Sequence, residues 1–183
     1  TSTIMSMNLW HDVSRGENTP NEINVIIEVP KGSYNKYEID KETGLIALDR
    51  ANYTSSPYPF DYGFMPQSLW DDGDALDVVV MTTHPLNVGI LVRVRPVAVI
   101  QMIDGGESDF KVICVPVDDR RFEDIHDIGD INAHDLRVFE HFFLTYKQLK
   151  GKEAVVKIDG ITGKKEAIEA VQRSIHLYES REK

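Results

Sequence analysis

Short apolar runs and alternating apolar and polar positions along the chain predict a series of strands. Residues 36–50 form one such pattern and predict a hairpin that turns at 40–44, where Asp, Lys, Glu, Thr and Gly follow one another. The other predicted strands are 23–30, 76–81, 90–103 (interrupted by Pro96), 110–117 and 154–158. All of these segments except 154–158 lie before residue 118, so most of the predicted strands precede the helical sequence.

Two later segments carry apolar residues at helical spacing. The first runs from about Asn132 to Lys150, with Asn132 and Asp135 in a capping arrangement, and the second from about Gly163 to Tyr178. Between the strands, residues 51–70 are rich in Pro, Tyr, Asn and Ser and predict a long irregular connection, which is usually functional. Residues 1–10 show little periodicity, and we expect part of them to be disordered.

Many short strands followed by helices favour an α+β fold, a small barrel with helices packed on its outside. The length of 183 residues fits a single domain spanning residues 1–183, long enough to bury a substantial core.

Charge and composition argue against some classes of partner. The chain has 30 acidic residues against 20 Lys and Arg, a net charge of −10, which argues against nucleic acid as a partner. The one cysteine, Cys114, lies in an apolar run and reads as a buried residue without an intrachain disulfide. Because no apolar stretch approaches about 18 residues, we expect no membrane partner and a cytoplasmic location.

The most informative segment is Asp72-Gly73-Asp74-Ala75-Leu76-Asp77, which places three carboxylates together just before an apolar run. Such a cluster costs folding free energy unless a positive charge lies between the side chains. Ligands that are oxygen only suit Mg²⁺ or Mn²⁺. An ordinary Asp-Gly turn with solvated acids is the alternative, but Asp77 at the mouth of a strand favours a metal.

Other charged residues interrupt the predicted strands, and each also has an ordinary structural explanation. Glu28 could be a charge that protects an edge strand against aggregation, and Lys36 with Glu38 could form a surface ion pair. The acidic loop between Asp104 and Asp109 could be a solvated hairpin tip.

Taken together, these residues resemble a known family. Residues 72–80 resemble the Asp-Gly-Asp-Pro-x-Asp signature of family I soluble inorganic pyrophosphatases, with Ala75 in the proline position. The likeness extends from about Glu22 to the end of the second helix. It includes Ile-Glu-Val-Pro, Lys-Tyr-Glu-Ile-Asp, Leu-Asp-Arg, Tyr-Pro-Phe-Asp-Tyr-Gly-Phe and His-Phe-Phe-Leu-Thr-Tyr-Lys.

The resemblance implies an OB-like five-stranded barrel and metal-dependent hydrolysis of pyrophosphate to two orthophosphates by direct attack of a metal-activated water. It implies several Mg²⁺ ions in each site, with Mn²⁺ as a substitute, which would offset the repulsion between an acidic protein and a polyanion. It further implies a homohexamer of the prokaryotic type, although Thr145 and Gln148 depart from some bacterial members.

The same resemblance assigns roles to fourteen residues. Asp74, interleaved with the metal ligands yet free to face the nucleophile, is expected to accept the proton. The expected metal ligands are Asp72, Asp77, Asp104 and Asp109. The expected substrate-binding residues are Lys36, Arg50, Tyr62, Lys111, Tyr146 and Lys147, supported by Glu28, Glu38 and Tyr58.

Three rival functions fit the sequence less well. An EF-hand would require Gly where Asp77 stands. An OB-type nucleic-acid binder conflicts with the net charge. A P-loop enzyme would need a G-x-x-x-x-G-K-[ST] motif, and the sequence has none.

Overall fold

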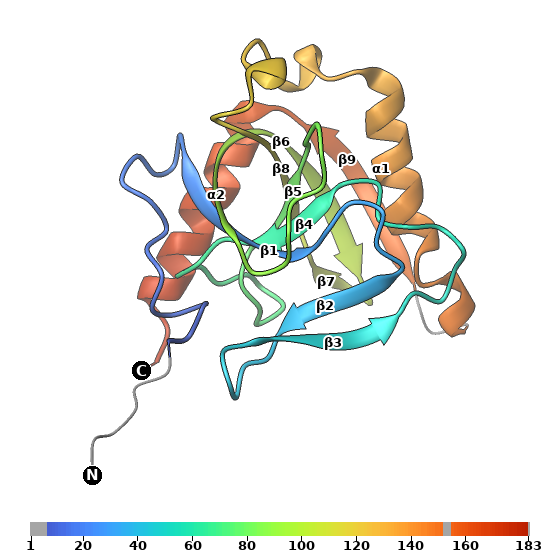
Figure 1. The fold of residues 1–183 in the computed structure, drawn as a ribbon, viewed down its shortest axis with the longest axis horizontal. Helices are drawn as coiled ribbons and strands as arrows, with labels where there is room; N and C mark the ends of the chain where they lie inside the picture. The colour runs from blue at the N-terminus through green and yellow to red at the C-terminus, as the bar shows by residue number, and fades with distance from the viewer. Residues whose placement is uncertain (1–6, 152–154, 183) are drawn as a thin grey trace.

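The fold is built on a closed ring of five strands, seen in a computed structural model that describes residues 7–151 and 155–182 (Figure 1). Around the ring, each strand pairs with the next: β1 (Ile23–Val29), β4 (Asp61–Phe64), β5 (Asp77–Val80), β8 (Lys111–Pro116), β6 (Leu91–Asp104) and back to β1. Within the ring only β5 and β8 run parallel. The prediction of an α+β fold with a five-stranded barrel is confirmed, the barrel being this ring.

The remaining elements attach to the ring. The short β7 (Glu107–Ser108) and β9 (Val156–Thr162) both pair with β6. A separate hairpin consists of β2 (Asn35–Ile39) and β3 (Ile46–Ala51). Two helices, α1 (Ala133–Thr145) and α2 (Lys164–Glu179), lie on opposite sides of the ring in Figure 1. Three short 3₁₀ helices span Arg120–Phe122, Ile128–Asp130 and Gln148–Lys150.

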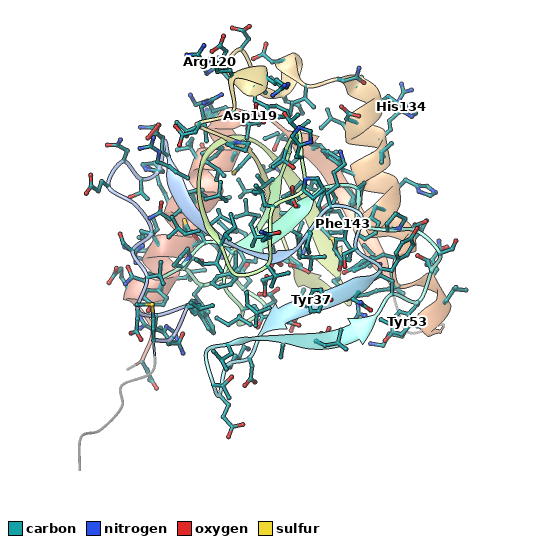
Figure 2. All side chains as sticks on the ribbon, in the orientation of Figure 1. Tyr37, Tyr53, Asp119, Arg120, His134 and Phe143 are labelled. Carbon is teal, nitrogen blue, oxygen red and sulfur yellow. The ribbon has the colours of Figure 1, made fainter. Side chains whose placement is uncertain are left out.

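The strands of the ring are buried on both faces, and each face packs against one helix. On β5, Val78 and Val80 belong to an apolar cluster that includes Val171 of α2. Val79, which points the other way, belongs to a cluster that includes Phe143 of α1. Figure 2 shows Phe143 reaching from α1 toward the strands, and its ring centroid lies 5.3 Å from that of Phe60. The aromatic face of α1 thereby forms one wall beside the ring.

The segment 51–70 was wrongly predicted to be irregular throughout, because it contains β4. All four residues of this strand are buried, including the charged Asp61. The Asp61 carboxylate accepts hydrogen bonds from the backbone amides of Lys31 (2.9 Å) and Leu86 (3.1 Å) and from the Thr82 hydroxyl. Because the hydrogen-bond partners of Asp61 lie far along the chain, the local sequence shows only a polar residue and does not indicate that this residue is buried.

Several boundaries also differ from the prediction. The first helix ends at Thr145 rather than Lys150, and a 3₁₀ turn follows before Gly151, whose φ is +133°. Pro96 does not interrupt β6, because the strand continues through a register shift between Pro96 and Ala98. The predicted strand 154–158 is observed as β9 from Val156, and Ala154 lies outside the described residues.

The N-terminal segment was expected to be partly disordered. Residues 1–6 lie outside the described part of the chain. Trp10, by contrast, is buried, and its indole N–H donates to the Ser68 carbonyl at 2.7 Å. Among the described residues, no helix is long and apolar enough to cross a membrane.

Gly63 on β4 generates the first testable prediction. A Cβ at this position would lie 2.0 Å from the carbonyl oxygen of Ile26 on β1, a contact that only a backbone shift could relieve. We therefore expect Gly63→Ala to lower the free energy of unfolding by about 1–3 kcal/mol or more. Gly160 on β9 has nothing within 4 Å of its would-be Cβ, so Gly160→Ala is the matched control.

Urea denaturation of the two variants measures the difference. A Gly63→Ala midpoint equal to that of Gly160→Ala would contradict the close approach of β1 and β4.

Candidate active site

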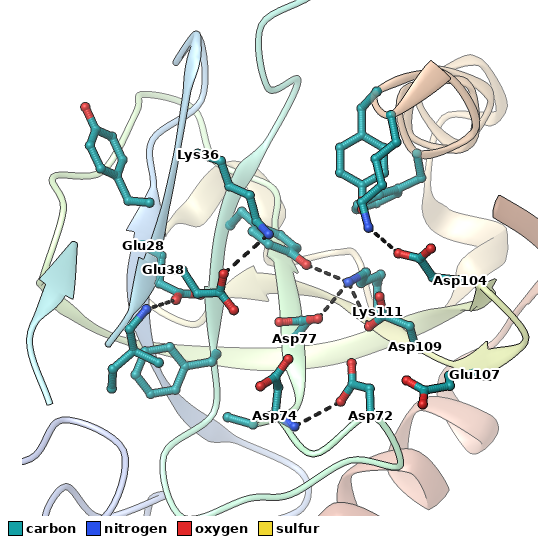
Figure 3. A pocket seen from close by; sticks show the side chains of 18 of the residues that line it. Glu28, Lys36, Glu38, Asp72, Asp74, Asp77, Asp104, Glu107, Asp109 and Lys111 are labelled. Carbon is teal, nitrogen blue, oxygen red and sulfur yellow. Dashed lines mark hydrogen bonds and ion pairs between the residues drawn. The ribbon is translucent and has the colours of Figure 1, made fainter. Parts of the chain in front are cut away.

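A cavity of about 430 Å³ opens where the β2–β3 hairpin, the loop before β5, the β6–β8 connection and the end of α1 meet (Figure 3). Thirteen of the fourteen residues singled out in the sequence line it. They are Glu28, Lys36, Glu38, Tyr58, Tyr62, Asp72, Asp74, Asp77, Asp104, Asp109, Lys111, Tyr146 and Lys147. Residues spread over 120 positions of sequence are therefore brought to one place.

Arg50 is the exception. It lies on β3 opposite Lys36 of β2, with its guanidinium 3.6 Å from the Asp49 carboxylate and 4.9 Å from the ring centroid of Tyr53. It is not among the residues that line the cavity.

Three aspartates form the acidic centre of the cavity. Asp72, Asp77 and Asp109 each offer a carboxylate oxygen, and these atoms all lie within 4.8 Å of one another. Asp77 opens β5 and Asp109 lies just before β8, so the parallel pairing of these strands brings the two residues together. This all-oxygen set fits a hard dication such as Mg²⁺ or Mn²⁺.

Asp104, the fourth predicted metal ligand, lies apart from this group. Its carboxylate pairs with the ammonium of Lys147, which follows α1. Among the described residues, the cluster of potential ligands contains only Asp72, Asp77 and Asp109.

Lys111 contacts two of the three aspartates. Its Nζ is 2.6 Å from Asp77 Oδ2, 2.9 Å from Asp109 Oδ1 and 2.7 Å from the Tyr62 hydroxyl, and its side chain is only 3% exposed. Burial acts to lower the pKa of Lys111, but the carboxylates of Asp109 and Asp77 outweigh it and hold that pKa well above its usual value. Lys111 therefore stays charged.

One ammonium does not balance three carboxylates. Burial, reinforced by the charge of Asp109, raises the pKa of Asp72 to about 7. Burial also raises the pKa of Asp77 to about 8, with Lys111 opposing and Asp109 adding to the rise. Burial would raise the pKa of Asp109 too, but Lys111 overcomes it and holds that pKa below its usual value. The cluster therefore gains stability from binding either protons or a cation.

Glu28 adds a further carboxylate behind the cluster. It is almost completely buried, and its carboxylate accepts a hydrogen bond from the Ile39 amide at 2.7 Å. Burial, followed by the charge of Asp77, raises its pKa well above the usual value. Glu28 thereby joins β1 to the end of β2 at the cavity wall.

Lysines reach the cavity rim from different elements. Lys36 of β2 lies 3.5 Å from Glu38 and 3.3 Å from Asp49. Lys147 pairs with Asp104, as noted above. Cations and carboxylates therefore both line the cavity, and together they can hold a small polyanion with its metal ions.

Three tyrosines complete the wall. Burial is the main cause that raises the pKa of Tyr58, Tyr62 and Tyr146 above the usual value. Their hydroxyls consequently remain neutral and can donate hydrogen bonds. The rings of Tyr58 and Tyr146 pack against Phe142 of α1, with centroids 4.7 Å and 5.5 Å away.

The sequence reasoning missed some lining residues, among them Trp10, Lys41 and Glu107. Glu107 belongs to the acidic loop that was recognised, but only the turn of the chain aims it at the cavity, as Figure 3 shows. Lys41 stands in the hairpin turn and Trp10 in the aperiodic N-terminal segment, so no local pattern marked either of them.

Comparisons with known proteins point in one direction. A family model described as inorganic pyrophosphatase matches residues 25–179. An inorganic pyrophosphatase of Picrophilus torridus is 41% identical over 94% of this chain and 97% of its own length. A protein named soluble inorganic pyrophosphatase 2 from Chlamydomonas reinhardtii is 42% identical over 93% of this chain and 88% of its own. The crystal structure of an inorganic pyrophosphatase from Thermus thermophilus superimposes with a TM-score of 0.91 at 42% identity, covering 95% of this chain and all of that one.

The charge imbalance of the acidic cluster generates the second prediction. With chelator present, the folded protein holds protons on Asp72 and Asp77 that the unfolded chain releases at lower pH. Stability then falls as pH rises from the ordinary carboxylate range toward about 8, because the folded state binds more protons. Mg²⁺ should remove this decline and raise the melting temperature by mass action, because binding adds about 2.7 kcal/mol to the free energy of unfolding at a concentration of 100 Kd.

Melting curves across pH, with chelator and with Mg²⁺, measure both effects. Asp77→Asn should flatten the decline and weaken the response to Mg²⁺. Asp159→Asn removes an exposed carboxylate on β9 outside the cavity lining and should change neither. A melting temperature in chelator that does not depend on pH would contradict the interpretation.

Proposed function

The chain belongs to the inorganic pyrophosphatase family, family I of the prokaryotic type, and hydrolyses inorganic pyrophosphate, and we propose that it does so with Mg²⁺ ions held by the cavity carboxylates. The observation that carries the proposal is the approach of Asp72, Asp77 and Asp109 within 4.8 Å. Several bound dications would supply the positive charge that offsets the substrate's charge and lowers the pKa of the attacking water, so that it can attack one phosphorus directly.

We assign the metal ions to Asp72, Asp77 and Asp109, with Asp104 contributing beside Asp109. Asp104 ends β6 and Asp109 follows β7, and both line the cavity. Asp104 is paired with Lys147, so its contribution requires that this lysine turn toward the substrate instead. Mn²⁺, which accepts the same oxygen ligands, is the proposed substitute for Mg²⁺.

Asp74 is the proposed proton acceptor. Its carboxylate lines the cavity, and its backbone amide donates to Asp72 Oδ1 at 3.1 Å, which ties it to the acidic cluster. It does not belong to the group of potential ligands within 4.8 Å. A carboxylate next to the metal ligands but outside them can take the proton of the attacking water.

The remaining residues would bind and orient pyrophosphate. Lys36, Lys111 and Lys147 can neutralise its oxygens as point charges, while Tyr62 and Tyr146 can donate hydroxyl hydrogen bonds. The negative charge on the two phosphate groups grows as the bridging bond breaks, so these contacts would stabilise the transition state more than the bound substrate. Glu28, Glu38 and Tyr58 support this set from the cavity wall. The assignment of Arg50 to the substrate rests on the family resemblance alone.

The third prediction tests the function directly. We expect phosphate release from pyrophosphate to require a divalent ion, to be abolished by chelator and to be restored by Mg²⁺, with Mn²⁺ as a substitute. ATP and nucleic acid should release far less phosphate, because the cavity offers charge for a compact polyanion and lacks a nucleotide-binding motif. Turnover in fully chelated buffer would overturn the proposed role of the metal.

The fourth prediction concerns assembly. We propose that the chain self-associates, as a hexamer, which the resemblance implies. Exposed apolar side chains support self-association, since Val88, Ile90 and Leu91 expose 42%, 36% and 49% of their surface next to one another. Sedimentation velocity of the purified chain should then give a mass about six times its 20.8 kDa, whereas a monomer at micromolar concentration would exclude the hexamer.

A cytoplasmic location is also proposed. The Chlamydomonas relative, which is named a soluble pyrophosphatase, supports it. Recovery of the chain in a membrane pellet after cell fractionation would contradict this location.

A further inference from the structure

We propose that Lys41 is a positioning residue that orients the carboxylate of Asp74 for proton transfer. This inference rests on the proposed function, because it takes Asp74 as the proton acceptor. Lys41 belongs to the turn between β2 and β3, and Asp74 to the acidic loop before β5, so the interaction joins two segments that the ring does not pair.

The contact is direct. The Lys41 ammonium lies 2.7 Å from Asp74 Oδ1 and 3.5 Å from the backbone carbonyl of Gly73. The hydrogen bond to Asp74 is the main cause that raises the pKa of Lys41, so the lysine stays charged. Among the described residues, no hydrogen bond or ion pair engages Asp74 Oδ2. Lys41 therefore occupies one oxygen and leaves the other to accept a proton.

The turn that carries Lys41 is itself fixed. The Asp40 carboxylate accepts the Thr43 amide at 3.0 Å and the Thr43 hydroxyl at 2.6 Å, which closes the turn locally. The Gly44 carbonyl accepts the Leu9 amide at 3.4 Å, which joins the turn to the N-terminal segment. Lys41 thus starts from a defined backbone position.

The ring of Trp10 lies beside the Lys41 ammonium. The Lys41 ammonium lies 5.9 Å from the centroid of the Trp10 ring, within reach of a cation–π interaction. The ring is held in place by the hydrogen bond from its indole nitrogen to Ser68, and the backbone carbonyl of Trp10 accepts the Gln67 amide at 2.7 Å. The N-terminal segment, which lies outside the matched family region, therefore contributes to the cavity.

The acidic loop needs such a restraint. Gly73 has a φ of +84°, a conformation that glycine adopts without strain, and Ala75 lacks the ring that a proline would use to fix φ. An exposed ion pair adds only about 0–1 kcal/mol to stability. The side chains of Lys41 and Asp74 are 60% and 39% exposed, so losing the pair should affect catalysis more than folding.

Lys41 could instead bind the substrate directly, and kinetics separates the two roles. A residue that contacts pyrophosphate equally in the ground and transition states changes KM, whereas one that aligns the proton acceptor changes kcat. We expect Lys41→Gln to lower kcat about tenfold with little change in KM. Lys41→Arg, which keeps the charge near Asp74 Oδ1, should restore most of the turnover.

Lys157→Gln is the matched control. Lys157 pairs with Asp159 at 3.1 Å with side-chain exposures of 71% and 45%, similar to those of the Lys41 pair, but neither residue lines the cavity. Its replacement should leave kcat, KM and melting temperature as in the parent chain. The melting temperature of Lys41→Gln should match that of this control.

The experiment is a double-mutant cycle with Asp74→Asn, measuring steady-state kinetics and, by calorimetry, Mg²⁺ affinity. Asp74→Asn should lower kcat strongly at nearly unchanged Mg²⁺ affinity, and Lys41→Gln should have no further effect in that background. If Asp74→Asn leaves kcat intact, the proposed function fails at its proton acceptor. If Asp74→Asn lowers kcat but Lys41→Gln does not, or if Lys41→Gln raises KM equally with and without Asp74, only the positioning role is overturned.

Discussion

The cavity depends on an unequal balance of buried charge. One ammonium, that of Lys111, contacts Asp77 and Asp109 while Asp72 lies within 4.8 Å of both, so three carboxylates share one nearby cation. Because these groups are buried, the imbalance costs folding free energy unless protons or dications bind. The arrangement of these charges therefore favours the binding of a metal ion. Dications bound there would reverse the local sign of the field, which would let an acidic protein act on a polyanion.

Backbone pairing creates this balance. The parallel register between β5 and β8 sets Asp77 opposite Lys111, and Asp109 lies two residues before Lys111, the first residue of β8. The closed ring fixes that register, since β5 is also paired with β4 and β8 with β6. Behind the charges, the aromatic face of α1 excludes water from one wall and keeps the tyrosine hydroxyls neutral. The ionic and apolar parts of the cavity therefore depend on the same packing.

The other half of the cavity comes from less regular structure. The β2–β3 hairpin lies outside the ring, and contacts such as Glu28 with the Ile39 amide hold it there. Lys41 extends this hairpin to the acidic loop, and Trp10 brings the N-terminal segment beneath it. Because these contacts are few, this half of the cavity can adjust more readily than the paired strands of the ring.

The sequence by itself determined the chemistry and most of the strands. Carboxylate spacing in 72–77 and period-two alternation depend on neighbours in the chain, so a local pattern records them. The resemblance to a known family, which is also a property of the sequence, implied fourteen candidate residues, and thirteen of them line one cavity. Tertiary structure decided the rest. Strand β4 is held by its pairing with β1 and β5 and by the distant partners of Asp61. The pairing of Asp104 with Lys147 likewise joins residues on separate elements. The place of Arg50 outside the lining and of Trp10 within it follows from how the hairpin and the N-terminal segment pack. Local periodicity could not reveal these features, because each depends on contacts between residues far apart in sequence.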